Sequence, residues 1–126
     1  MKVWVITMIG LILFISLGIY TQNQLVKTSL HFTKEIKKID ALIEQQQWKP
    51  ASKKLIVFQN QWKKTKPFWA MLIIHREMDS IDEALIRTKK AVQSKNASEA
   101  QMEIGSLKHY IQHIPERERF SLVNIL

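Results

Sequence analysis

The sequence predicts an all-α protein: an N-terminal transmembrane helix that continues into a small domain of about four helices, arranged as two stacked αα-hairpins. Three observations lead to this prediction. An uncharged apolar run occupies residues 3–20. Apolar residues then recur every three or four positions along the rest of the chain, which is typical of amphipathic helices. Gly and Pro number only 3 each among 126 residues, a composition that favours helices.

The apolar run reads VWVITMIGLILFISLGIY and just reaches the length that a helix needs to cross the hydrocarbon core. Trp4 and Tyr20 lie near its two ends, where amphipathic rings prefer the membrane interface. A cleaved signal peptide is the alternative, but it favours a shorter apolar region and small residues at the cleavage site. We therefore predict an uncleaved membrane anchor over residues 1–20, with the span at 3–20, and a helical domain over residues 21–126.

The charges around the span bear on its orientation. Lys2 precedes it directly, whereas six uncharged residues follow Tyr20. Residues next to a span weigh most, and long domains cross largely regardless of their charge. We expect a single-pass protein of the cell membrane with its N-terminus in the cytoplasm and its C-terminal domain outside. The chain has no cysteine, which excludes a lipoprotein, disulfides and thiolate metal sites.

Four helices are predicted, over residues of about 21–47, 50–65, 67–93 and 97–114. Proline restricts the residue before it and suits the first turn of a helix, which places boundaries at Pro50 and Pro67. Pro115 is expected to end the fourth helix, leaving a short tail over 115–126. The stripes are Leu25, Ser29, Phe32, Ile36, Ile39 and Ile43; Ala51, Leu55, Phe58 and Trp62; Ile74, Met78, Ile81, Leu85, Thr88 and Val92; and Ala100, Ile104, Leu107, Ile111 and Ile114.

An internal repeat is suggested when the sequence is aligned with itself at an offset of 49 residues. Part of each stripe in the first two predicted helices then coincides with part of a stripe in the last two. Trp62 then coincides with Ile111, and Ile36 with Leu85. Two stacked helical hairpins would produce this pattern. Since any amphipathic helical protein matches itself loosely, the two-hairpin architecture is the firmer prediction and does not depend on a duplication.

The stretch WKKTKPFW, residues 62–69, interleaves lysines with aromatic residues around a proline. Its simplest interpretation is a corner between two helices. Trp62 and Trp69 would pack inward there, and Lys63, Lys64 and Lys66 would lie in solvent. Such a corner can also touch anionic lipid, a wall polymer or a partner protein, because the chain carries a net charge of +8. Nucleic-acid binding needs exposed rings along a basic track, and we do not expect it in a membrane-anchored chain.

A polar cluster occupies the predicted third helix, where His75, Asp79 and Asp82 share one flank. A histidine with two carboxylates can bind a divalent cation or activate a proton acceptor. The simpler interpretation is a histidine at the core boundary, hydrogen-bonded to Asp79 within a packing network. A partner-binding surface is the third possibility. We expect a packing or partner-binding network of Trp62, Trp69, His75, Asp79 and Asp82, with no metal, cofactor or catalytic residue.

His109 and His113 form a second pair, four residues apart. This spacing can chelate zinc, but the stretch HYIQH lacks the glutamate of HEXXH, and a third ligand would have to come from another helix. We expect exposed or boundary histidines. The chain also has no glycine-rich phosphate loop, serine elbow or dinucleotide fingerprint.

Several of these residues, taken in order, resemble an uncharacterised bacterial family, domain of unknown function 4363. The resemblance rests on the tryptophan pair, on the run IIHREMD at 73–79 with Ile81 beyond it, on HIPE at 113–116 and on the C-terminal NIL. It extends over nearly the whole chain, including the anchor. It implies a small single-pass helical protein of spore-forming Gram-positive bacteria with no assigned activity. It also implies genes beside those of multi-pass membrane proteins, and hence an accessory subunit.

Two classes of function follow from these patterns. The first is a membrane-anchored interaction or scaffold protein, an accessory subunit whose partners are the lipid bilayer and another membrane protein. The second is a small metal-dependent or hydrolytic enzyme that uses the polar cluster or the second histidine pair. A small helical domain with no pocket signal favours the first, so we expect no enzyme.

Overall fold

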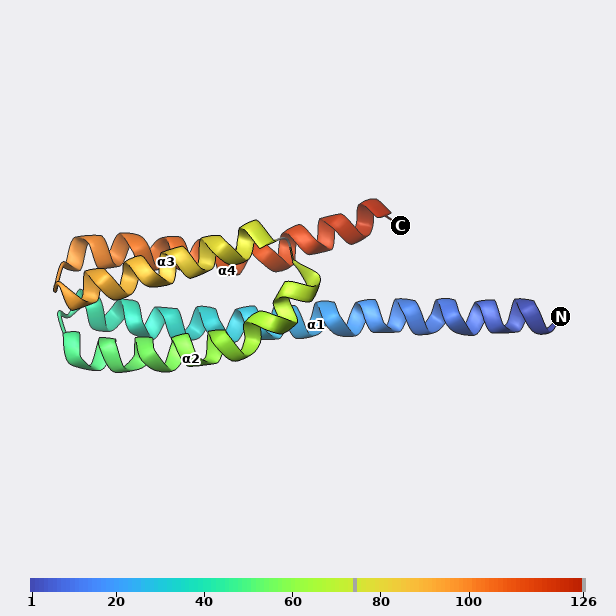
Figure 1. Cartoon of the computed structure of the whole chain (residues 1–126), viewed down its shortest axis with the longest axis horizontal. Coiled ribbons are helices and arrows are strands. Elements are labelled where there is room, and N and C mark those ends of the chain that lie inside the picture. Colours follow the sequence, from blue (N-terminus) through green and yellow to red (C-terminus); the bar gives the residue numbers. More distant parts are fainter. Residues whose placement is uncertain (74, 126) are drawn as a thin grey trace.

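The computed structural model describes the backbone of residues 1–73 and 75–125 and the side chains of residues 1–73 and 75–116. Every regular element in these ranges is a helix. They are α1 (Lys2–Glu44), α2 (Trp48–Leu72), α3 (His75–Gln93) and α4 (Ala97–Ile125) (Figure 1). The predicted all-α fold is confirmed. Ile74, from the third predicted stripe, and Leu126 lie outside the described residues.

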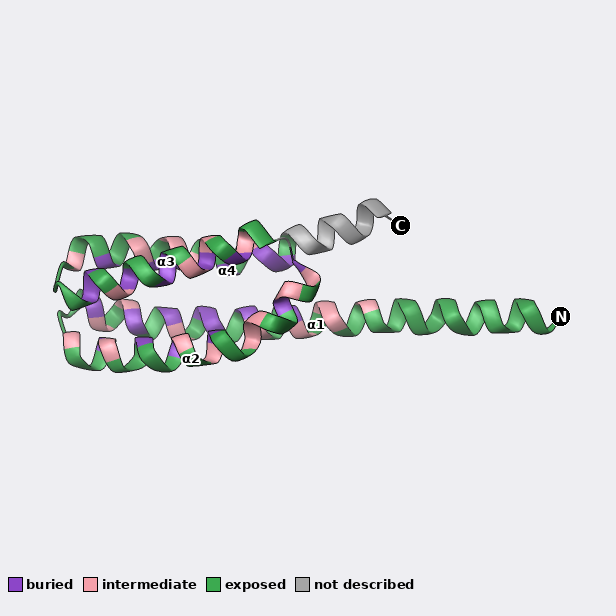
Figure 2. Ribbon diagram, viewed as in Figure 1, coloured by how far each residue is buried: buried purple, intermediate pink, exposed green. Residues whose placement is uncertain are grey.

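α1 joins the apolar run to the bundle without a break. Its 43 residues correspond to a length of about 65 Å. Residues 3–17 are all exposed, and Leu25 is the first residue of the core. Figure 2 shows this end of α1 standing clear of the other helices. Among the described residues it is the one helix long and apolar enough to cross a membrane.

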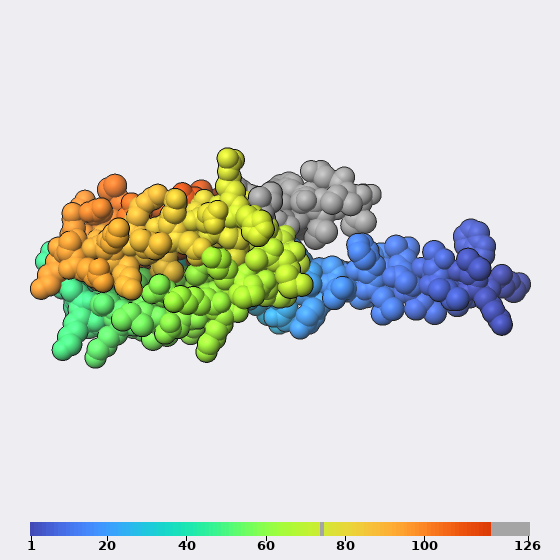
Figure 3. Space-filling model, in the orientation of Figure 1, coloured from blue at the N-terminus to red at the C-terminus, as the bar shows by residue number. Residues whose placement is uncertain are grey.

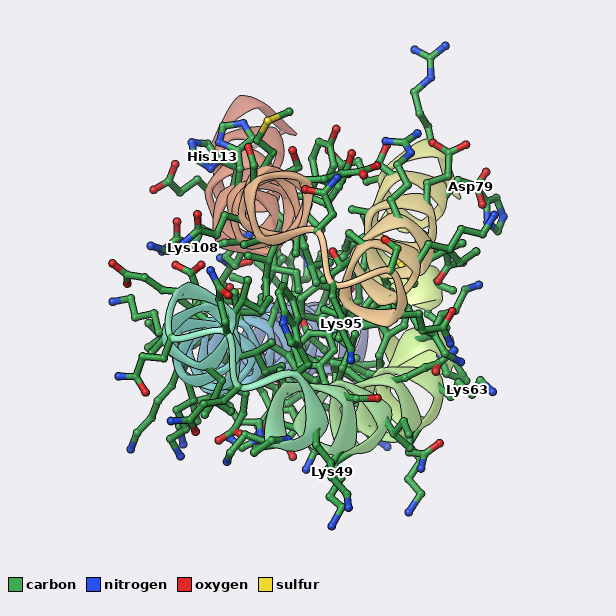
Figure 4. The ribbon with its side chains drawn as sticks, turned by 90° about the vertical axis from the view of Figure 1, so that its left-hand side faces the viewer. Lys49, Lys63, Asp79, Lys95, Lys108 and His113 are labelled. Carbon is green, nitrogen blue, oxygen red and sulfur yellow. The ribbon has the colours of Figure 1, made fainter. Side chains whose placement is uncertain are left out.

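The helices form an antiparallel bundle of two hairpins, α1–α2 and α3–α4. α1 packs against α2 and α4, and α3 packs against the same two helices. Seen end-on, the four helices therefore sit at the corners of a square (Figure 4). The described residues of the predicted stripes form the core between them. The prediction of two stacked hairpins agrees with this arrangement.

The turns of the two hairpins have the same hydrogen bonds. In the first, the N–H of Gln46 donates to the carbonyl of Ile43, and the N–H of Gln47 donates to that of Leu42, both at 2.9 Å. In the second, both bonds recur 49 residues later, at 3.1 and 3.0 Å. Gln46 and its counterpart Lys95 have left-handed backbone, with φ of 57° and 56°. This combination is the Schellman motif that follows many helices.

Burial repeats with the same offset of 49 residues. The buried pairs are Phe32 and Ile81, Ile36 and Leu85, Ile39 and Thr88, Ile43 and Val92, Ala51 and Ala100, Leu55 and Ile104, Phe58 and Leu107, and Trp62 and Ile111. Since both the turns and the core positions agree, the two hairpins form a structural repeat.

The expected boundary at Pro67 is wrong. α2 continues through Pro67, and the chain leaves the helix only at Ile73, whose backbone is extended (φ −125°, ψ 152°). Proline removes one backbone donor and crowds the carbonyl four residues before it, which bends a helix more readily than it ends it. Figure 1 shows α2 bending toward α3 at this end. Trp62 and Trp69 lie two turns apart, so a continuous helix keeps both on the core face.

The boundary near Pro50 is also displaced. α1 ends at Glu44 and α2 begins at Trp48, so that Pro50 falls inside the first turn. The missing N–H of a proline costs little there, because donors in the first turn have no partner within the helix.

The expected helix end at Pro115 is wrong as well, since α4 runs on to Ile125. Pro115 has no N–H to donate to the carbonyl of Ile111, one turn earlier. The hydroxyl of Ser29 in α1 donates to that carbonyl at 2.8 Å in a buried position. The Gln22 side-chain amide donates to the carbonyl of Pro115 at 3.1 Å. α1 thus supplies hydrogen bonds where proline interrupts those of α4, which explains how the helix passes it.

Candidate functional site

Trp62 and Trp69 form the centre of an aromatic cluster in the core. They are 1% and 0% exposed, and their rings meet edge-to-face with centroids 5.4 Å apart. Phe32 of α1 lies against both, at 6.0 and 6.1 Å, and Phe58 lies 5.1 Å from Phe32. Edge-to-face pairs at these separations stabilise a core beyond the area that they bury. The two tryptophans therefore hold α2 against α1, and their expected inward packing agrees with this arrangement, although both lie on one helix rather than at a corner between two.

Asp82 of α3 connects this cluster to the second hairpin. The indole N–H of Trp62 donates to Asp82 Oδ1 at 2.8 Å, and the ammonium of Lys66 contacts Oδ2. Lys66 is therefore an ion-pair partner rather than a freely solvated side chain. The side chains of Lys66 and Asp82 are 42% and 30% exposed, so solvent screening keeps the contribution of the pair small. The geometry indicates a structural link between α2 and α3.

His75 and Asp79 lie apart from this link. Both are exposed, and Figure 4 shows Asp79 at the outer edge of α3. The expected hydrogen bond between them is not among those that the described residues form. Within the described residues, no three His, Cys, Asp or Glu side chains come close enough to hold a metal ion. Of the five predicted site residues, the structure brings together Trp62, Trp69 and Asp82.

His109 and His113 stack on the surface of α4, with ring centroids 4.1 Å apart. The Nδ1 atom of His113 lies 2.9 Å from the carbonyl of His109, so one nitrogen of that ring is engaged locally. The pair borders a pocket of about 100 Å³ that α3 closes with Arg76 and Ser80. Pockets for small-molecule ligands generally enclose about 300–1,000 Å³. This one is too small to be a substrate site of that kind.

The positive charge of the molecule is concentrated on one hairpin. Residues 21–73 contain ten lysines and three acidic residues, whereas residues 75–126 contain eight basic and eight acidic residues. Only Lys38 and Lys66 of the ten form ion pairs within the described part of the chain. Lys49 and Lys63 point away from the bundle in Figure 4. The outer face of α1 and α2 is therefore a basic surface whose lysines are largely unpaired. A separate count for each hairpin would have revealed it in the sequence.

The family model described as Domain of unknown function (DUF4363) matches residues 19–125. The chain belongs to this family. The match covers the helical domain and leaves residues 1–18 outside. The resemblance was expected to include the predicted anchor, and the family model does not match that segment. The description of this family assigns it no activity. Comparison with curated proteins and with solved structures found no match.

Proposed function

We propose that this member of the DUF4363 family is a membrane-anchored docking protein, an accessory subunit of a membrane complex. One observation carries the proposal. The exposed apolar end of α1 and the first core helix of the bundle are one continuous helix. An exposed apolar helix of this length is stable in a bilayer and costly in water. A continuous helix would also hold the bundle at a defined angle to the membrane, which suits a subunit that presents one face to a partner.

The basic surface of the α1–α2 hairpin supports an acidic partner protein in the same membrane. Eight unpaired lysines raise the local positive potential, which speeds encounter with an acidic surface and orients it. Lys49, Lys53 and Lys54 lie near the end of the hairpin farthest from the anchor, and all three are exposed. A partner that reaches this end must project from the membrane as far as the bundle does.

Binding, rather than catalysis, is the activity that we propose. Asp82, one member of the candidate catalytic cluster, already accepts hydrogen bonds from Trp62 and Lys66. His75 and Asp79 are exposed, and neither is among the described residues that line the pocket beside His109 and His113. The alternative of a small metal-dependent or hydrolytic enzyme therefore has less support.

We propose that the N-terminus lies in the cytoplasm and the domain outside the cell. The support is Lys2 before the span and the uncharged residues after Tyr20. Protease added to intact protoplasts should digest the domain. Full protection in protoplasts, followed by digestion after lysis, would reverse the orientation and leave the docking proposal in place.

A photo-crosslinking amino acid at position 53 tests the docking face in native membranes, with position 90 on α3 as the matched exposed control. We expect a discrete adduct of constant mass from position 53, weakened by added salt because exposed charges are screened. Lys49→Gln with Lys54→Gln should weaken it several-fold. Lys90→Gln with Lys95→Gln removes the same charge from the other hairpin and should leave it unchanged. Equal adducts from both positions, or equal losses in both double variants, would contradict a docking surface on α1–α2.

A further inference from the structure

The last part of α2, residues 63–72, lies at the end of the bundle nearest the anchor. Pro67 bends this part of the helix toward α3, across the end of the core (Figure 1). In the space-filling view it forms the surface beside the point where α1 leaves the bundle (Figure 3). The lysine-aromatic stretch at 62–69 therefore lies at the end of the bundle from which the apolar part of α1 emerges (Figure 1).

Two large apolar side chains of this segment are exposed. Met71 is 84% exposed and Phe68 is 36% exposed, whereas Trp69 between them is fully buried in the core. Lys64, Phe68 and Met71 follow the spacing i, i+4, i+7, which places them on one helix face, opposite the buried Trp69. Lys63 and Lys64 are exposed as well, and neither has an ion-pair partner among the described residues. The face combines apolar tips with free ammonium groups.

The distance from the span to the first core residue of α1 matches the thickness of a headgroup layer. Tyr20 ends the apolar run, and Leu25 is the first core residue. The four residues between them rise about 6 Å along the helix. The headgroup region on each side of the hydrocarbon core is about 5–8 Å thick. With the apolar run in the bilayer, the end of the bundle would begin within or just above the headgroups.

We infer that Lys63, Lys64, Phe68 and Met71 form a contact with the anionic lipid surface of the membrane that holds the anchor. Phe68 and Met71 would enter the boundary between headgroups and acyl chains, and the two ammonium groups would bind lipid phosphates. The bundle is then held at two points, the anchor and the bend of α2, which fixes its tilt. Buried Trp69 holds the segment to the core while its neighbours contact lipid. This inference rests on the proposed membrane anchoring.

The absence of native cysteine allows single environment-sensitive probes in the full-length chain, reconstituted in vesicles. Met71→Cys reports on the proposed contact. Met102→Cys is the matched control, because Met102 is also exposed, at 67%, but lies near the start of α4 at the far end of the bundle. Phe14→Cys reports on the anchor itself. Quenchers in water, at the headgroups and deep in the acyl chains locate each probe, in vesicles with and without phosphatidylglycerol.

We expect the probe at 71 to be shielded from the aqueous quencher and reached by the headgroup quencher in anionic vesicles. The probe at 102 should stay fully accessible to the aqueous quencher, and the probe at 14 should respond to the deep quencher. Lys63→Gln and Lys64→Gln should lower the ratio of docked to free bundle by about fivefold for each lysine, with an unchanged melting temperature. If 14 is deep but 71 stays as accessible as 102, the lipid contact is wrong and the anchor stands. If 14 is not reached by the deep quencher, the anchoring itself fails.

Discussion

The two hairpins share a backbone plan and differ in what they carry. Their turns repeat the same hydrogen bonds at an offset of 49 residues, and equivalent positions are buried in both. The α1–α2 hairpin contains the aromatic cluster, the membrane-spanning candidate and all of the excess positive charge. The described core of the α3–α4 hairpin is aliphatic, and its sequence has no net charge.

This difference teaches that the repeated geometry depends on few residues. Turn conformation and the spacing of buried positions determine the hairpin, and the identity of the core side chains can then vary if the space is filled. The second hairpin supplies a surface on which the first packs, together with Asp82, which holds Trp62. The first hairpin contains the residues of the contacts that we propose with a membrane and a partner.

The largest expected effect is at the pair of equivalent core positions, Trp62 and Ile111. Trp62→Ala should lower the free energy of unfolding by about 3–5 kcal/mol, because it removes a buried aromatic ring and leaves a cavity. It also leaves Asp82 without its indole donor. Ile111→Ala should cost about 2–5 kcal/mol. Denaturant titration measures both. Exposed Ile56→Ala is the control and should stay within about 0.5 kcal/mol of the wild type. A stable Trp62→Ala protein would contradict a core role for the aromatic cluster.

A smaller effect is expected at Ser29, where the hairpins meet. Ser29→Ala leaves the buried carbonyl of Ile111 without a donor, which should cost about 1–3 kcal/mol. Pro115→Ala restores a backbone N–H for that carbonyl, so in the double variant the loss due to Ser29→Ala should largely vanish. A double-mutant cycle measures this coupling. Thr28→Ala, whose hydroxyl bonds within its own helix, is the control. Additive losses would show that Ser29 does not substitute for the missing donor.

The smallest effects are expected at the two turns. Gln46→Gly and Lys95→Gly each replace a side chain in left-handed backbone, where glycine has no steric penalty. Each should raise the free energy of unfolding by up to about 1 kcal/mol, and the two gains should be similar and additive. Thermal melts of the single and double variants test this. A gain at one turn and a loss at the other would break the equivalence of the hairpins.

Helix number, stripes and the offset of 49 residues were predictable because they depend on periodicity within short stretches of chain. The inward packing of Trp62 and Trp69 followed from the same periodicity. The effect of the prolines on the helices could not be predicted from this periodicity. A proline favours a local boundary, but whether the helix ends depends on partners elsewhere in the chain. Ser29 sits 82 residues from Ile111, and no local pattern links them. The hydrogen bonds that Asp82 accepts were not predicted, because their donors lie on another helix.

By itself, the sequence determined the all-α class, the apolar N-terminal helix, the two-hairpin plan and the membership that its motifs suggested. The class, the apolar helix and the two-hairpin plan rest on composition and on spacings of three, four and seven residues, which act locally, whereas the family resemblance rests on motifs taken in order. Only the tertiary structure decided that α2 and α4 pass through Pro67 and Pro115. It also decided that Asp82 accepts hydrogen bonds from Trp62 and Lys66, and that Phe68 and Met71 remain exposed. Hydrogen-bond satisfaction and side-chain burial depend on which helices become neighbours, and that is decided only when the two hairpins pack together.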